Sequence, residues 1–212
     1  MPEQPDAAQL QSGLDELGIS ASAERVQQYL HYIALLRKWN RTYNLTTIRP
    51  ADMIPLHILD SLTLLPFIKG ERCLDVGSGA GLPGLILALN NPQQHWHLLD
   101  SNGKKTRFLR QAVTELQLTN VQIVQSRVED YVPQQPFATI VCRAYATLDV
   151  YLQSVSHLFA ANQTILAMKS TLAAEELQVL QQMRLPYRIQ QLTIPGIAAT
   201  RNLLLIEPDR RA

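Results

Sequence analysis

From Arg72 onward, short runs of β-type apolar residues alternate with segments whose apolar residues recur at helical spacing. The expected strands are 72–76, 95–99, 121–125, 138–143, 163–168, 187–194 and 202–207, and the expected helices between them are 83–90, 104–116, 148–159 and 172–182. This alternation predicts an α/β fold whose mostly parallel seven-stranded sheet carries helices on both faces. Only residues 195–201 join the last two strands. Because a parallel crossover needs a longer connection, these two strands are expected to pair antiparallel.

The first 68 residues predict helices and no strands. Between Ala7 and Trp39 apolar residues recur at helical spacing, which indicates two helices, and Ser20 or Ser22 is available to cap the second. Residues 40–47 are polar and predict a loop, and Pro50 starts another expected helix over 51–65. We therefore expect an N-terminal helical cap over residues 1–68 and a core over 69–212, joined in one compact unit.

Bulk composition limits the classes that remain. A chain of 212 residues that is 46% hydrophobic can bury a core without disulfides or a structural metal, so Cys73 and Cys142 are expected to be buried thiols of a reducing compartment. No leader-like start and no apolar run long enough to cross a bilayer is present, so a cytoplasmic protein is expected. A net charge of +1 does not by itself indicate a nucleic-acid binder.

The loop after the first expected strand carries glycines at alternate positions, Gly77, Gly79 and Gly81. Such a loop turns sharply and lets a ligand approach the backbone, at the edge where ligands of parallel sheets bind. A dinucleotide fingerprint would have its third glycine where Leu82 stands, and Asp75 would repel a pyrophosphate and attract a cation. The loop therefore favours S-adenosylmethionine, with a purely structural turn as the alternative.

Two further segments suit an adenosine. Asp100 ends the second expected strand, where a carboxylate accepts ribose hydroxyls in NAD enzymes and methyltransferases alike. Its alternative role is an N-cap for the helix that holds Lys104 and Lys105. Residues 126–130 follow the third strand, where an adenine edge would lie, or they form a surface acidic turn.

Several motifs, taken in order, resemble one family. The segments are Trp39–Thr46, His57–Leu62, Asp75–Gly84, Ser101–Lys105 with Arg107–Leu109, Arg127–Glu129 and Arg143–Ala146. This set is similar to the RsmG family, also called GidB, whose members use S-adenosylmethionine to methylate nitrogen-7 of a guanine in bacterial 16S ribosomal RNA. The resemblance implies a Rossmann-like methyltransferase fold and small-subunit RNA, free or in the 30S subunit, as the partner.

The resemblance also implies roles for single residues. The backbone around Gly77 and Leu82 should hold the methionine part and the ribose, and Val128 and Glu129 should meet the adenine. Arg143 should line the cofactor and substrate pocket, and its place at the end of an apolar strand independently favours a pocket. Ser170 stands where the family commonly has a glycine after Lys169.

Methyl transfer to guanine nitrogen-7 needs no general base because that atom already carries a free lone pair. Positioning, by Arg143 above all, should supply the rate. The histidines show no metal-ligand spacing, so no metal is expected. The substrate candidates are polar and basic residues near the expected mouth of the site: Asn40, Asn44, His57, Lys104, Lys105 and Lys169. The basic ones could equally be solvated helix faces, and His57 could simply pair with Asp60 one turn later.

Three other functions remain open at this stage. An NAD-type Rossmann oxidoreductase would use Asp100 equally well, although Leu82 and the antiparallel final strands argue against it. A ribosome-assembly factor could bind RNA on this fold without catalysis. A methyltransferase could also act on a small molecule or a protein. The length of one domain, with no apolar helix stripe left over, predicts a monomer.

Overall fold

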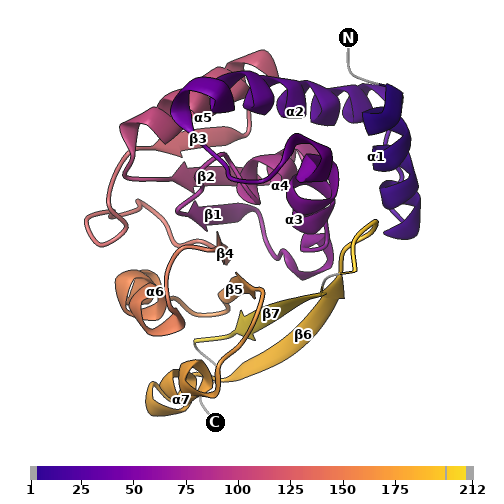
Figure 1. Cartoon of the computed structure of the whole chain (residues 1–212). Coiled ribbons are helices and arrows are strands. Elements are labelled where there is room, and N and C mark those ends of the chain that lie inside the picture. Colours follow the sequence, from indigo (N-terminus) through magenta and orange to yellow (C-terminus); the bar gives the residue numbers. More distant parts are fainter. Residues whose placement is uncertain (1–3, 199, 209–212) are drawn as a thin grey trace.

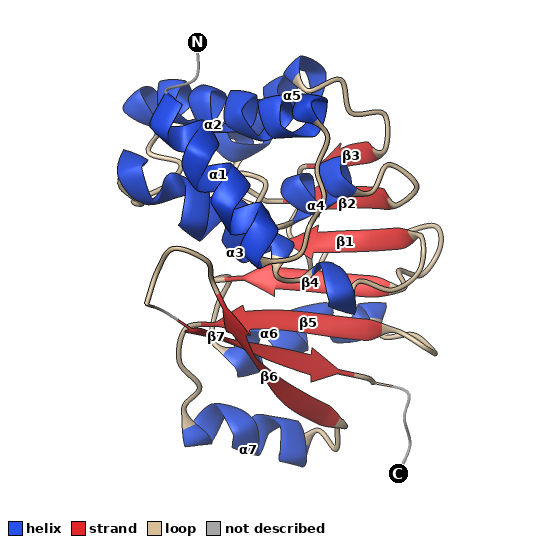
Figure 2. Cartoon of the chain, turned by 90° about the vertical axis from the view of Figure 1, so that its right-hand side faces the viewer, coloured by secondary structure: helices blue, strands red, loops and turns tan. Residues whose placement is uncertain are grey.

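The computed structural model describes residues 4–198 and 200–208 and contains one seven-stranded sheet with the order β3-β2-β1-β4-β5-β7-β6. Figure 2 shows the strands in this order from top to bottom. Their bounds are β1 Arg72–Val76, β2 His95–Leu99, β3 Val121–Val124, β4 Thr139–Arg143, β5 Thr164–Lys169, β6 Tyr187–Thr193 and β7 Thr200–Ile206. All pairs are parallel except those of β7 with β5 and β6. The predicted antiparallel end of the sheet is confirmed.

Helices cover both faces of the sheet (Figure 1). One layer holds α4 (Gly84–Asn90) and α5 (Gly103–Glu115) together with the N-terminal helices, and the other holds α6 (Leu148–Val155) and α7 (Ala174–Gln182). Successive strand residues face opposite layers, so Cys73 packs in the first apolar cluster and Leu74 in the second. Both cysteines are free and buried, as expected.

Helix α2 (Ala23–Tyr43) packs against α4 and α5, and helix α1 (Gln4–Glu16) packs against α2 and the helical segment Ile54–Leu59. The Ser22 hydroxyl caps α2 by accepting from the Arg25 N–H. Tyr32 donates to the Ala80 carbonyl at 2.8 Å, and Trp39 packs edge-on against Phe108 of α5. A single apolar cluster therefore runs from α1 into the sheet. The division into residues 1–68 and 69–212 stays a prediction.

The structure changes two details of the expected N-terminal region. The loop expected at 40–47 starts only at Asn44, because α2 continues to Tyr43 and ends where Asn44 adopts the left-handed conformation (φ 49°) that asparagine tolerates. The helix expected over 51–65 is broken into a 3-10 turn (Pro50–Asp52), a π-helix (Ile54–Leu59) and the short α3 (Asp60–Leu62). Pro55 lacks the amide N–H that a regular α-helix would need there.

Candidate functional site

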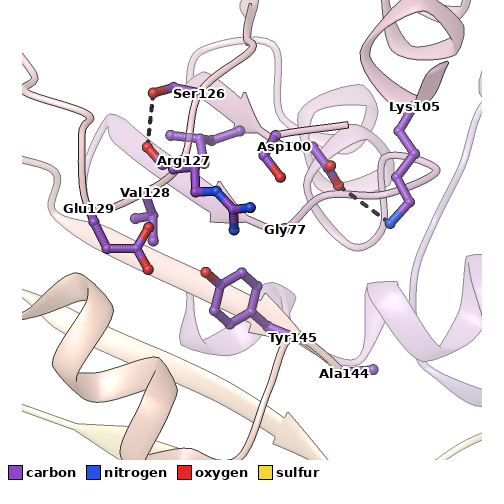
Figure 3. A pocket seen from close by; sticks show the side chains of 11 residues that line it. Gly77, Asp100, Lys105, Ser126, Arg127, Val128, Glu129, Ala144 and Tyr145 are labelled. Carbon is purple, nitrogen blue, oxygen red and sulfur yellow. Dashed lines mark hydrogen bonds and ion pairs between the residues drawn. The ribbon is translucent and has the colours of Figure 1, made fainter. Parts of the chain in front are cut away.

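The site lies where the order of the strands reverses, between β1 and β4, at their carboxyl ends. A cavity of about 200 Å³ opens there. Figure 3 shows its side chains, with Tyr145 on the side opposite Ser126. The lining residues are Gly77, Leu99, Asp100, Ser101, Lys105, Ser126, Arg127, Val128, Glu129, Ala144 and Tyr145. The three segments expected to surround an adenosine thus meet in one cavity, which we call the first cavity.

Gly77 forms the floor of this cavity because no side chain fits at its position. Its φ is 70°, and a Cβ built on it would lie 2.4 Å from Cδ2 of Tyr145. The N–H groups of Gly77 and Ser78 both donate to the Leu99 carbonyl, which fixes the loop to the end of β2. Gly81 and the buried Leu82 do not line the cavity, and a Cβ built on Gly81 would meet Leu85 of α4 and Leu109 of α5. A glycine at 77 is therefore required by close approach as well as by backbone conformation.

Asp75 lies under the glycine loop and is fully buried. Its Oδ2 accepts the Gly84 N–H at 2.9 Å, whereas its Oδ1 has no hydrogen-bond partner among the described residues. Burial raises the pKa of this carboxyl to about 7. Asp75 lines neither the first cavity nor any other described pocket, so its unpaired Oδ1 lies beneath the glycine loop and not on a cavity wall.

Asp100 lines the first cavity from the end of β2. Its Oδ2 accepts the Gly79 N–H at 2.9 Å and its Oδ1 accepts the Asn102 N–H at 2.8 Å, while Lys105 Nζ lies 3.7 Å from Oδ2. The alternative role as N-cap of α5 is wrong, because the Asn102 side chain accepts from Lys104 N and Lys105 N instead. A carboxylate has about four acceptor positions, so Asp100 keeps room for hydroxyl donors.

Val128 and Glu129 also line the first cavity. Val128 is buried and Glu129 is exposed. The segment is therefore more than the surface acidic turn considered above, since its apolar side chain packs inward beside the cavity. Of the two lysines, Lys105 lines the cavity and Lys104 points to solvent.

A second cavity of about 500 Å³ adjoins the first, and Ala144 lines both. Its polar lining comes from the ends of β4, β5 and β7 and from the π-helix. It includes Arg143 and Lys169, as well as His57, Asp60 and Arg201. Lys169 donates to Glu176 at 2.5 Å and to the Ala146 carbonyl, despite the Ser170 that follows it.

His57 and Asp60 do not pair with each other, so that expectation was wrong. His57 Nδ1 lies 3.1 Å from the Leu56 carbonyl, which can only accept, so Nδ1 carries the proton. Nε2 then accepts from the Thr46 hydroxyl. Burial, with the charge of Arg143 second, lowers the pKa of His57 to about 4. His57 is therefore neutral, and both of its ring nitrogens are hydrogen-bonded.

The two asparagines predicted to touch substrate lie outside both cavities. Asn40 donates to the Thr46 carbonyl and accepts the Thr46 N–H, which closes the loop at the end of α2. It borders a separate cavity of about 830 Å³ between α1, α2 and residues 50–53. Asn44 is the left-handed residue that ends α2. Both are explained by local structure.

Arg201 also lines the second cavity and pairs with Asp60, and no motif in the sequence connects these two residues. The topology carried the missing signal. Because β7 runs antiparallel beside β5, its first residues lie next to the last residues of β5, with Asn202 opposite Lys169. Arg201 is thereby brought to the carboxyl edge of the parallel strands. Among the described residues there is no cluster of histidine, cysteine or carboxylate side chains that could hold a metal ion, and no helix is long and apolar enough to cross a membrane.

Comparison with known proteins points to one family. The family model described as GidB, rRNA small subunit methyltransferase G, matches residues 25–204. A ribosomal RNA small subunit methyltransferase G of Pseudomonas syringae pv. tomato is 44% identical over 94% of this chain and 95% of its own length. One from Alkalilimnicola ehrlichii is 45% identical over 92% of this chain and 89% of its own.

The fold also matches solved methyltransferases. A magnesium protoporphyrin IX methyltransferase from Synechocystis PCC 6803 with bound S-adenosylmethionine superposes with a TM-score of 0.60 at 13% identity, covering 89% of this chain and 99% of that one. At this identity the likeness concerns the fold alone.

Proposed function

Because the chain belongs to the GidB family of rRNA small subunit methyltransferase G proteins, we propose that it transfers a methyl group from S-adenosylmethionine to nitrogen-7 of a guanine in small-subunit ribosomal RNA. The observation that carries this proposal is the pair of adjoining cavities at the switch point of the sheet. The first suits the adenosine of a cofactor, and the second offers an acceptor its own space. A dinucleotide oxidoreductase would need room for a pyrophosphate near Asp75.

The described residues fit S-adenosylmethionine. Asp100 would accept from the ribose hydroxyls, and the carboxylate of Asp75, beneath the glycine loop, would attract the ammonium group through its unpartnered Oδ1. Val128 and Glu129 would border the adenine, with Tyr145 across the cavity from Ser126 (Figure 3). When bound, the cofactor supplies a methyl group made electrophilic by the sulfonium. No residue needs to carry a redox or metal function.

The protein's own residues bind and position the acceptor. Nitrogen-7 already has a lone pair, so no proton has to be removed before attack, and the neutral, fully engaged His57 suits a site without a general base. The deep major groove of A-form RNA hides nitrogen-7, so the target guanine must lie in a loop or be flipped out. Placing it in line with the methyl group then supplies the rate.

The first test is transfer of labelled methyl to small ribosomal subunits that lack this modification, and to their protein-free RNA. Digestion of the product is expected to give labelled 7-methylguanosine from at least one substrate. Gly79→Asp, which forces a side chain into the glycine loop at a φ of 58° and within 4.0 Å of Lys105 Nζ, should abolish transfer and leave RNA binding intact. RNA binding without any methyl product from the unmutated protein would instead support a non-catalytic assembly factor. Label in a different nucleoside would contradict the nitrogen-7 assignment.

We propose that the protein acts as a monomer in the cytoplasm, where its RNA substrate is made. The residues proposed to bind the cofactor and the acceptor all come from one chain, which supports a monomer. Size-exclusion chromatography with light scattering should give a mass near 23.8 kDa. A mass near twice this value would contradict the prediction.

A further inference from the structure

One carboxylate in the second cavity holds two arginines that come from different strands. Asp60 is 0% exposed, its Oδ2 accepts from Nη1 of Arg143 at 3.0 Å, and its Oδ1 accepts from Nε of Arg201 at 3.2 Å. Arg143 ends β4 and Arg201 lies at the start of β7, with β5 between them. Nη1 of Arg143 also donates to the Leu56 carbonyl. Asp60 thus fixes the distance between the two guanidinium groups.

These ion pairs are expected to contribute little to the free energy of unfolding. Burying a carboxylate with its partners carries a desolvation penalty that the ion pairs only partly offset, and apolar residues of similar volume commonly do as well. One carboxylate also balances only one of the two arginines. The remaining cation of the cavity, Lys169, is already paired with Glu176. The residues that line the cavity therefore carry one positive charge in excess.

The excess charge is available to a ligand. Both arginines line the second cavity, and their side chains are 17% and 22% exposed. Nη2 of Arg143 and both terminal nitrogens of Arg201 have no hydrogen-bond partner among the described residues. None of these three nitrogens is among the buried atoms without a partner, so they remain accessible. Guanidinium groups held in this way suit the paired oxygens of a phosphate.

Building on the proposed function, we propose that Asp60 is a positioning residue, which holds Arg143 and Arg201 so that their free N–H groups bind one phosphodiester of the RNA acceptor strand. One excess positive charge matches the single negative charge of a phosphodiester. The carboxylate has a second effect, because the guanine becomes cationic on methylation at nitrogen-7. Two unbalanced arginines beside it would oppose that charge, whereas Asp60 offsets one of them.

The salt dependence of RNA binding tests this directly. Each single-strand phosphate contact contributes about 0.7 to the slope of log K against log salt. We expect Arg201→Gln to lower the slope by about that amount for a small-subunit RNA fragment, measured by fluorescence anisotropy, and Arg201→Lys to retain it. Arg188→Gln is the matched control, since Arg188 is exposed on the neighbouring strand β6 and outside both cavities. Equal slopes for Arg201→Gln and Arg188→Gln would overturn the proposal.

The role of Asp60 is tested by comparing the effect of one substitution on RNA binding with its effect on cofactor binding. Asp60→Asn should raise KM for the RNA substrate about tenfold or more, the loss expected for a charge-assisted hydrogen bond. It should leave the affinity for S-adenosylhomocysteine unchanged, because Asp60 does not line the first cavity. Equal losses in both would mean general damage to the fold and would overturn positioning. If this variant does not fold, the Arg201 variants decide. Failure of the unmutated protein to methylate RNA would count against the proposed function and not against the salt slopes.

Discussion

Replacing Asp75 by asparagine is expected to make the protein more stable at pH 8 and unable to hold its cofactor tightly. Burial raises the pKa of this carboxyl from 3.8 to about 7 in the folded chain. The folded state therefore binds a proton more strongly than the unfolded state, so the contribution of Asp75 to stability is lost as pH rises from about 4 to about 7. Asparagine does not titrate, and its side-chain oxygen can still accept the Gly84 N–H that Oδ2 accepts now.

The measurement is the free energy of unfolding of both proteins between pH 5 and pH 8 without cofactor. One pKa unit corresponds to about 1.4 kcal/mol, so the variant should gain about 2–3 kcal/mol relative to the parent over this range. Comparing the two pH values removes the constant cost of burying the amide nitrogen. Asp130→Asn, at an exposed carboxylate beside the first cavity, is the control and should show no such gain. If the difference in unfolding free energy between the two proteins does not change with pH, the raised pKa of the buried Asp75 carboxyl would be contradicted.

The same substitution removes the acceptor proposed for the ammonium group of the cofactor. Isothermal titration with S-adenosylhomocysteine at pH 7.5 should show an affinity at least about tenfold lower, corresponding to about 1.4 kcal/mol. The parent should itself bind more weakly as pH falls below about 7, because Asp75 must lose its proton, whereas the variant should lack this dependence. Unchanged affinity would remove Asp75 from the cofactor site.

The sheet and the position of the glycine loop were predictable because their signals are local. Asp75 is the second-last residue of a strand that leads into alternating glycines, and Asp100 directly follows the next strand, so both carboxylates are placed near the carboxyl edge of any parallel sheet. The short connection over residues 195–201 likewise determined the antiparallel end. These inferences need only residues that are neighbours in sequence, and the structure agrees with them.

The second cavity could not be predicted in the same way. Asp60 meets Arg143 and Arg201 across 83 and 141 residues, and no periodicity connects them. The helix that carries Asp60 is also irregular, so the one-turn spacing from His57 suggested a pair that does not exist. Asn40 was predicted to contact substrate, but a short-range contact explains its position. Its side chain hydrogen-bonds the backbone of Thr46 and closes the local loop. Long-range ion pairs and side chains that bond to the backbone require coordinates.

Substituting Gly77 by alanine is expected to lower the affinity for the cofactor strongly, although it adds only one methyl group. The residue has φ 70°, which costs a non-glycine residue about 1–2 kcal/mol. The new Cβ would also lie 2.4 Å from Cδ2 of Tyr145, a ring carbon that cannot stay in place. Since Gly77 and Tyr145 both line the first cavity, moving the ring changes the cavity itself. We expect affinity for S-adenosylhomocysteine to fall about tenfold or more, with a melting temperature lower by several degrees.

Two variants separate backbone strain from the clash. Gly18 has nearly the same φ, 67°, but a Cβ there would have no atom within 4 Å, so Gly18→Ala reports the backbone cost alone. Gly77→Ala should lose more stability than Gly18→Ala, and only Gly77→Ala should lose cofactor affinity. Adding Tyr145→Ala removes the ring that the new Cβ would meet, so it should cost less stability in the Gly77→Ala background than in the parent. Identical thermal losses for the two glycine variants, with cofactor affinity unchanged, would show that the Tyr145 contact does not shape the site.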